Sequence, residues 1–144
     1  MQKNIKVALI VLIFMVIFLG GIYMFLKCDS SLIFQIIEDA KPDKASFIIS
    51  NNSRYTYVYN SEYKLELLQD GKWVEIPYST QYPLFTSEAI HIRPFSTAKI
   101  LIDWSGYYGE IGEGKYRILK KLYKKEKDNK LGEQINMFAE FSVP

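Results

Sequence analysis

The chain has one cysteine and one histidine among its 144 residues. Cys28 has no second cysteine to pair with, so the hydrophobic core alone must hold the fold. One histidine and one distant cysteine cannot build a zinc site. The acidic residues Glu38, Asp39 and Asp43 cluster, but their spacing fits no calcium-binding loop. The sequence therefore predicts no metal and no cofactor.

An excess of charge of one sign is also lacking, since 18 Lys and Arg residues face 16 Asp and Glu residues. Three of the lysines, Lys3, Lys6 and Lys27, flank an apolar segment near the N-terminus. Without these three, fifteen basic residues face sixteen acidic ones. The rest of the chain is nearly neutral, which argues against nucleic acid as a partner.

One long run without charge extends from Val7 to Leu26. Its twenty residues, at about 1.5 Å each, match a hydrocarbon core of about 30 Å, so we predict a transmembrane helix. A cleaved secretory signal would have a shorter apolar region and a small-x-small site, which Gly20 and Gly21 do not provide. The residues before Cys28 do not fit a lipoprotein signal either. We predict a signal anchor over residues 1–27, a spacer over 28–31 and one domain over 32–144.

Positive charge sets the orientation of such a segment. The amino terminus, Lys3 and Lys6 precede the apolar run, whereas Asp29 follows Lys27 at once. This bias predicts a single-pass protein of the cell membrane, with the N-terminus cytoplasmic and the domain outside. Cys28 then lies at the membrane boundary as a spare interfacial residue, with an intermolecular disulfide or palmitoylation as the alternatives.

Period-two alternation predicts short strands throughout the domain and no further helix. Asp70-Gly71 predicts a two-residue hairpin turn. Lys120 breaks the alternation of its segment, which predicts a bulge or a strand that leaves the sheet there. Seven to eight such strands favour an all-β fold, an antiparallel two-sheet sandwich. The predicted strand segments are 32–37, 46–50, 63–67, 73–76, 90–92, 99–104, 115–120 and 134–143, with residues 55–59 either strand or loop.

The stretch Asp103–Lys120 predicts one end of this sandwich. A strand ends at Trp104, a turn-rich segment crosses over, and a second strand begins with Tyr116 two residues past Gly114. A tyrosine so placed can send its hydroxyl back to the backbone a few residues upstream, as in a tyrosine corner.

These residues resemble a family, the bacterial immunoglobulin-like domain of Gram-positive secreted and membrane-attached proteins. The resemblance covers about residues 47–141 and includes the segments 49–53, 63–65 and 71–77. Its more specific part is Asp103-Trp104 followed by Tyr108-Gly109-Glu110 and Gly114–Ile118. The resemblance implies an immunoglobulin-like sandwich and no enzymatic activity. The predicted corner residues are Trp104, Tyr108, Gly109, Gly114, Tyr116 and Arg117.

Two groups of residues form a candidate contact surface. Tyrosines offer contact area at low entropic cost, although those near position 57 could instead continue a strand. Lysines near position 127 should lie at the end where the chain leaves the membrane, and they could rest on anionic lipid or remain a solvated loop tip. The candidate residues are Tyr55, Tyr57, Tyr59, Lys124, Lys125, Lys127 and Lys130.

No reaction follows from the sequence. His91, Asp103 and Ser105 occur in the chain order of one protease class, but they lack a glycine-framed nucleophile and an identifiable oxyanion donor. We therefore predict a non-catalytic interaction or structural module with a protein partner. The alternative is an inhibitor or regulator of an extracellular enzyme such as a protease, which predicts that a loop such as Pro77–Ser87 is extended and exposed.

Overall fold

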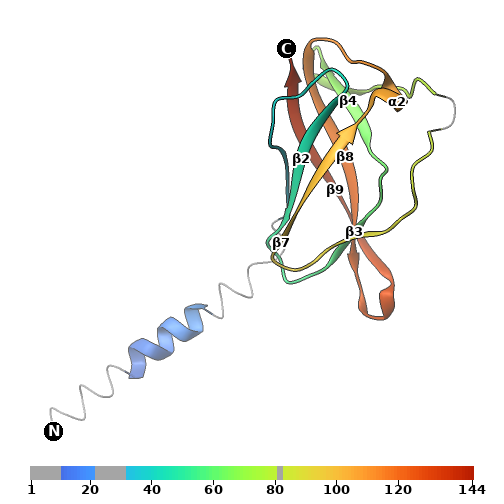
Figure 1. Ribbon diagram of the computed structural model, residues 1–144. Helices are drawn as coiled ribbons and strands as arrows, with labels where there is room; N and C mark the ends of the chain where they lie inside the picture. Colours follow the sequence, from blue (N-terminus) through green and yellow to red (C-terminus); the bar gives the residue numbers. More distant parts are fainter. Residues whose placement is uncertain (1–10, 22–31, 81–82) are drawn as a thin grey trace, which may run out of the picture.

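Two antiparallel sheets face each other across one core in the computed structural model, which describes residues 11–21, 32–80 and 83–144 (Figure 1). The three-stranded sheet has the order β1 (Leu32–Ile36), β2 (Lys44–Asn51), β7 (Ser96–Asp103). The six-stranded sheet has the order β5 (Lys72–Glu75), β4 (Lys64–Gln69), β8 (Gly114–Lys125), β3 (Tyr57–Tyr59), β6 (Ile90–Ile92), and β9 (Leu131–Val143) also pairs with β8.

The predicted antiparallel sandwich is therefore present, with nine strands in the described part of the chain instead of seven to eight. The additional strand is β3, where the sequence left strand and loop open. Two short helical turns, α2 (Ser105–Tyr108) and η1 (Lys127–Asn129), lie in the connections.

Residues 11–21 are helical. None of the helices among the described residues has the length and apolar character needed to cross a membrane. Part of the predicted span over residues 7–26 lies outside the described ranges. Cys28 also lies outside them.

The alternating apolar residues of both sheets meet in the core. Phe47 and Ile49 of β2 and Leu65 and Ile118 of the facing sheet are fully buried. Phe141 of β9 contacts Phe47 edge-on, with ring centroids 5.8 Å apart. The Asp70-Gly71 turn joins β4 to β5 with positive φ at both residues (49° and 76°), as the hairpin signal predicts.

The prediction for Lys120 is wrong. β8 continues through this residue, and its register shift lies between Tyr123 and Lys125. The interruption is in the strands that pair with β8. β4 pairs with β8 as far as Leu119, and β3 pairs with β8 from Tyr123 onward. Lys120 lies opposite the gap between these two strands.

Strand register places the loops at two ends. The hairpin end consists of residues 51–56, 93–96 and 124–133. Leu32, the first described residue of the domain, is in register with Asn51, and Asn51 with Ser96, so the domain begins at this end. The β8–β9 hairpin extends beyond the sandwich there (Figure 1). The corner end holds α2 and the start of β8.

One edge of the three-stranded sheet is open. Among the described residues, β7 forms a ladder only with β2. Its side chains alternate, and Leu101 on the outer face is 65% exposed. Immunoglobulin-type sandwiches carry a fourth strand in the corresponding sheet. Among residues 32–80 and 83–144, no strand pairs with this edge of β7.

Candidate functional site

The corner end is a buried structural unit. Trp104 is fully buried, donates its indole N–H to the Pro42 carbonyl at 2.7 Å, and stacks on Phe141 with centroids 5.3 Å apart. The Tyr116 hydroxyl donates to the Gly112 carbonyl at 2.9 Å, four residues upstream. The Tyr108 hydroxyl accepts from the Leu65 N–H at 3.2 Å.

Two glycines in the corner meet backbone and packing constraints. Gly109 ends α2 with φ of 74°, a conformation that L residues rarely adopt. A Cβ on Gly114 would lie 3.1 Å from side-chain atoms of both Leu67 and Tyr116. The positive φ of Gly109 and the close packing at Gly114 are requirements of the fold, and they account for glycine at both positions.

Arg117, also predicted for the corner, lies elsewhere. Its side chain is on the outer face of the six-stranded sheet, where it pairs with Glu66. The guanidinium lies over the rings of Trp73 and Phe138, with centroid distances of 4.6 and 4.3 Å. Arg117 therefore links side chains of β4, β5 and β9 on the outer face and does not contribute to the corner.

The tyrosines of the candidate contact surface divide into two groups. Tyr57 and Tyr59 are buried in β3, so of the two alternatives these tyrosines continue a strand, and they do not belong to a contact surface. Burial raises the pKa of Tyr59. Tyr55 is half-buried and lies under two cations, with Lys124 Nζ 3.5 Å and Arg54 Cζ 5.2 Å from its ring centroid.

The hairpin end is organised by Asn51, a buried residue that the sequence marks only as the end of a strand. Its amide nitrogen donates to the carbonyls of Tyr55 at 2.7 Å and Arg93 at 2.9 Å, and more weakly to Ile92 at 3.4 Å. Its oxygen accepts from both the N–H and the hydroxyl of Ser53. One side chain thus fixes two loops that are distant in sequence.

The third loop of this end is tied to the first through backbone. Lys125 donates its N–H to the Thr56 carbonyl at 2.8 Å. Lys124 and Lys125 are half-buried, whereas Lys127 and Lys130 at the tip are exposed. The four candidate lysines therefore share one end with Tyr55.

Lys120 is the only buried charged side chain among the described residues, at 3% exposure. It borders a cleft of about 340 Å³ lined by both sheets, including Tyr59, Tyr63, Phe85, Ile90 and Ile100. Its ammonium donates to the carbonyls of Asn60 at 2.8 Å and Glu62 at 3.1 Å, the residues that span the gap between β3 and β4. Lys120 thus supplies hydrogen-bond donors to two backbone carbonyls in the gap, where β8 has no neighbouring strand on that side in the described part of the chain.

Burial lowers the pKa of Lys120 to about 8. Between pH 8 and about 10 the unfolded chain, with an ordinary lysine pKa near 10.4, binds a proton that the folded chain has lost, so stability rises with pH. We expect the free energy of unfolding of the wild type, relative to Lys120→Met, to increase by about 2 kcal/mol from pH 7.5 to 9.5. Urea unfolding at both pH values measures this difference.

The comparison with Lys120→Met removes the contributions of other titrating groups. Burial raises the pKa values of Tyr63 and Tyr108, so these tyrosines lower stability only above pH 10, when they ionise in the unfolded chain. A difference between the two proteins that stays constant with pH would contradict the prediction.

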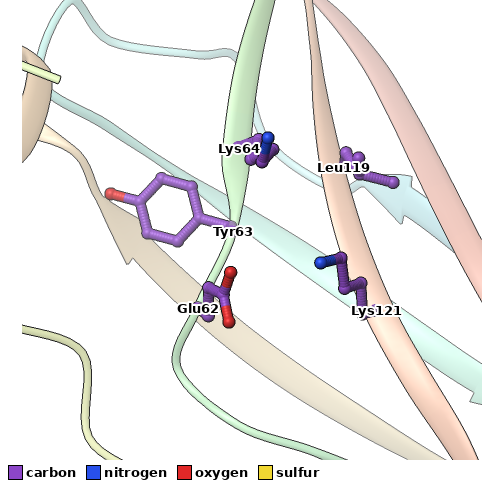
Figure 2. Close-up of a pocket in the computed structure, with 5 residues that line it drawn as sticks. All are labelled: Glu62, Tyr63, Lys64, Leu119 and Lys121. Atoms are coloured by element: carbon purple, nitrogen blue, oxygen red, sulfur yellow. The ribbon is translucent and has the colours of Figure 1, made fainter. Parts of the chain in front are cut away.

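A second, shallow depression lies on the outer face of the six-stranded sheet. It holds about 10 Å³, room for no more than about one water molecule. Glu62, Lys64, Leu119 and Lys121 border it, whereas the Tyr63 ring points away from Lys64 toward the core side (Figure 2). This depression cannot hold a ligand.

The three residues that occur in the chain order of a protease triad, His91, Asp103 and Ser105, do not form one site. Asp103 accepts from the Ser105 N–H at 3.0 Å and hydroxyl at 2.6 Å, and these hydrogen bonds lower its pKa. His91 lies exposed in β6, opposite Val58. In the described ranges, no three His, Cys, Asp or Glu residues are grouped so that they could hold a metal ion.

The loop named by the inhibitor alternative is anchored to the domain at two aromatic side chains, Tyr78 and Phe85. Phe85 contacts Tyr63 and Tyr107, with centroids 5.6 and 4.7 Å apart. The Tyr107 hydroxyl donates to the Leu84 carbonyl at 2.6 Å, and Tyr78 donates to the Tyr63 carbonyl at 3.1 Å. Between these anchor points the loop is exposed: Leu84 is 83% exposed, and Pro77, Ser79, Thr86 and Ser87 are exposed as well. The inhibitor alternative stays a prediction.

Most of the domain matches one family of known proteins. A model of the family described as "Bacterial Ig-like domain" matches residues 33–141. No curated protein matches the chain. Among solved structures, the archaellum periplasmic stator protein FlaG of Sulfolobus acidocaldarius is similar with a TM-score of 0.37 and 16% identity, over 74% of this chain and 98% of that chain. Self-complemented MyfA, the major subunit of Myf fimbriae of Yersinia enterocolitica, is similar with a TM-score of 0.38 and 12% identity, over 79% of this chain and 98% of that chain.

Proposed function

This chain belongs to the bacterial Ig-like domain family, and we propose that it is a non-catalytic interaction or structural module held outside a cell membrane by residues 7–26. Fold alone does not supply a function, so the proposal depends on how the domain meets its anchor. The partner we propose for the exposed part of the domain is a protein.

One observation carries the proposal: the domain begins at the end that bears the basic hairpin. Leu32 is in register with Asn51 at the hairpin end. Five residues separate it from the apolar run, and an extended chain covers at most about 3.6 Å per residue. The hairpin end therefore stays within about 20 Å of the apolar run, and the corner end, with Glu110 and Glu113 exposed, faces away from the membrane.

Cysteine labelling in intact cells tests this topology. We expect a membrane-impermeant maleimide to label Cys28, because it follows the span on the outer side. In a Cys28→Ser background, Gln2→Cys should be labelled only after permeabilisation. The unsubstituted Cys28→Ser chain is the control for background labelling. Labelling at position 2 in intact cells, or a mature chain that lacks the apolar run, would overturn the proposal.

A further inference from the structure

Phe95 occupies an unusual position at the hairpin end. It lies at the tip of the β6–β7 connection, its side chain is 63% exposed, and its φ is 53°. This left-handed conformation costs free energy for a residue with a Cβ, whereas glycine adopts it freely. A large apolar side chain has no reason within the fold to be both strained and exposed, so the position points to an external contact.

The backbone beneath Phe95 is fixed. Its N–H donates to the Ser53 carbonyl at 3.3 Å, and the Ser96 hydroxyl donates to the Arg93 carbonyl at 2.7 Å. The Arg93 carbonyl also accepts from the buried Asn51 amide. The phenyl ring is therefore presented outward by a rigid turn.

Basic residues gather at the same end of the domain as this ring. The three loops of the hairpin end carry six basic residues and three acidic ones, Glu126, Asp128 and Glu133. The domain from residue 32 to 144 has fifteen of each sign, so the positive excess at this end is matched by a negative excess elsewhere. The basic residues are Arg54, Arg93, Lys124, Lys125, Lys127 and Lys130.

A second exposed apolar side chain lies at the same end. Leu131 begins β9 beside the hairpin tip and is 57% exposed. Exposed apolar side chains among lysines and arginines, on a surface held close to a bilayer, are the combination that binds the interface of an anionic membrane.

We propose that the hairpin end docks on the headgroups of an anionic bilayer, with Phe95 and Leu131 inserted at the acyl boundary and the six basic residues on the lipid charges. This proposal rests on the proposed anchoring, which brings the hairpin end to the membrane surface. The lipid is identified by its chemistry: an anionic headgroup for the basic residues and an acyl chain for the two apolar ones.

Depth-dependent quenching tests the proposal in the intact chain. We place an environment-sensitive fluorophore on Phe95→Cys in a Cys28→Ser background and reconstitute the chain into vesicles with brominated acyl chains. In vesicles that contain phosphatidylglycerol, quenching at position 95 should be several-fold stronger than at Glu113→Cys, the matched position at the corner end. It should weaken in phosphatidylcholine alone and at about 0.5 M salt, where the Debye length falls well below 10 Å.

A second readout separates lipid contact from folding. With the fluorophore on Leu131→Cys, adding Phe95→Gly should reduce the quenching several-fold, although glycine relieves the backbone strain and leaves the fold intact. Phe95→Leu should retain the quenching. Equal quenching at positions 95 and 113, or equal quenching in neutral and anionic vesicles, would overturn the proposal. A chain that fails to float with the vesicles would instead overturn the anchor.

Discussion

Replacing Trp104 with alanine is expected to lower the free energy of unfolding by about 4 kcal/mol, because a fully buried aromatic side chain is lost and a cavity remains. The cavity would open at the corner, where the indole stacks on Phe141 and ties the Pro42 carbonyl to the start of the crossover. Urea unfolding of the intact chain in a mild detergent, followed by circular dichroism, measures the change.

A conservative substitution separates the two contributions of this side chain. Trp104→Phe retains most of the packing but removes the indole N–H, and it should cost about 1 to 2 kcal/mol for one unsatisfied carbonyl and a smaller void. An alanine variant as stable as the phenylalanine variant would show that the corner contributes little to stability.

Replacing Asn51 with alanine should have the next largest effect, about 3 to 4 kcal/mol, because several buried polar groups lose their partners at once. The Tyr55 and Arg93 carbonyls would lose their donor, and the Ser53 N–H and hydroxyl would lose their acceptor. Chemical unfolding gives the magnitude. Amide exchange should accelerate in residues 53–56 and 93–96 while β2 and β7 near the corner stay protected.

Asn60 provides the matched control for this prediction. Its side-chain oxygen accepts one hydrogen bond, from the Glu62 N–H at 3.1 Å, and Asn60→Ala should cost about 1 kcal/mol. Similar losses for the two variants would contradict the role of Asn51 as the residue that joins two loops.

Local patterns were sufficient to predict most of the strands and the family. Alternation located β2, β6 and β9, and the Asp70-Gly71 turn fixed the register of one hairpin. The resemblance to the bacterial immunoglobulin-like family, drawn from the segment around Trp104 and Tyr116, is confirmed by the match over residues 33–141. These features depend on side chains close together in sequence.

The features that sequence reasoning missed depend on distant partners. Lys120 breaks an alternating pattern, and only the pairing of β8 with two separate strands reveals that it fills a gap with its ammonium group. Asn51 bonds to backbone more than forty residues away. Phe95 follows Arg93-Pro94, a turn signal, but the sequence does not state that the phenylalanine itself takes positive φ.

The open edge of β7 has a consequence for neighbouring copies of the chain. Unpaired strand edges invite aggregation, most readily through antiparallel pairing. Under the proposed anchoring, β7 of every copy in one membrane runs from the hairpin end outward, so neighbouring copies present parallel edges and antiparallel pairing is not open to them. We expect the proposed anchor to oppose clustering, and domains cut from the membrane at the spacer should scatter light where anchored ones remain dispersed.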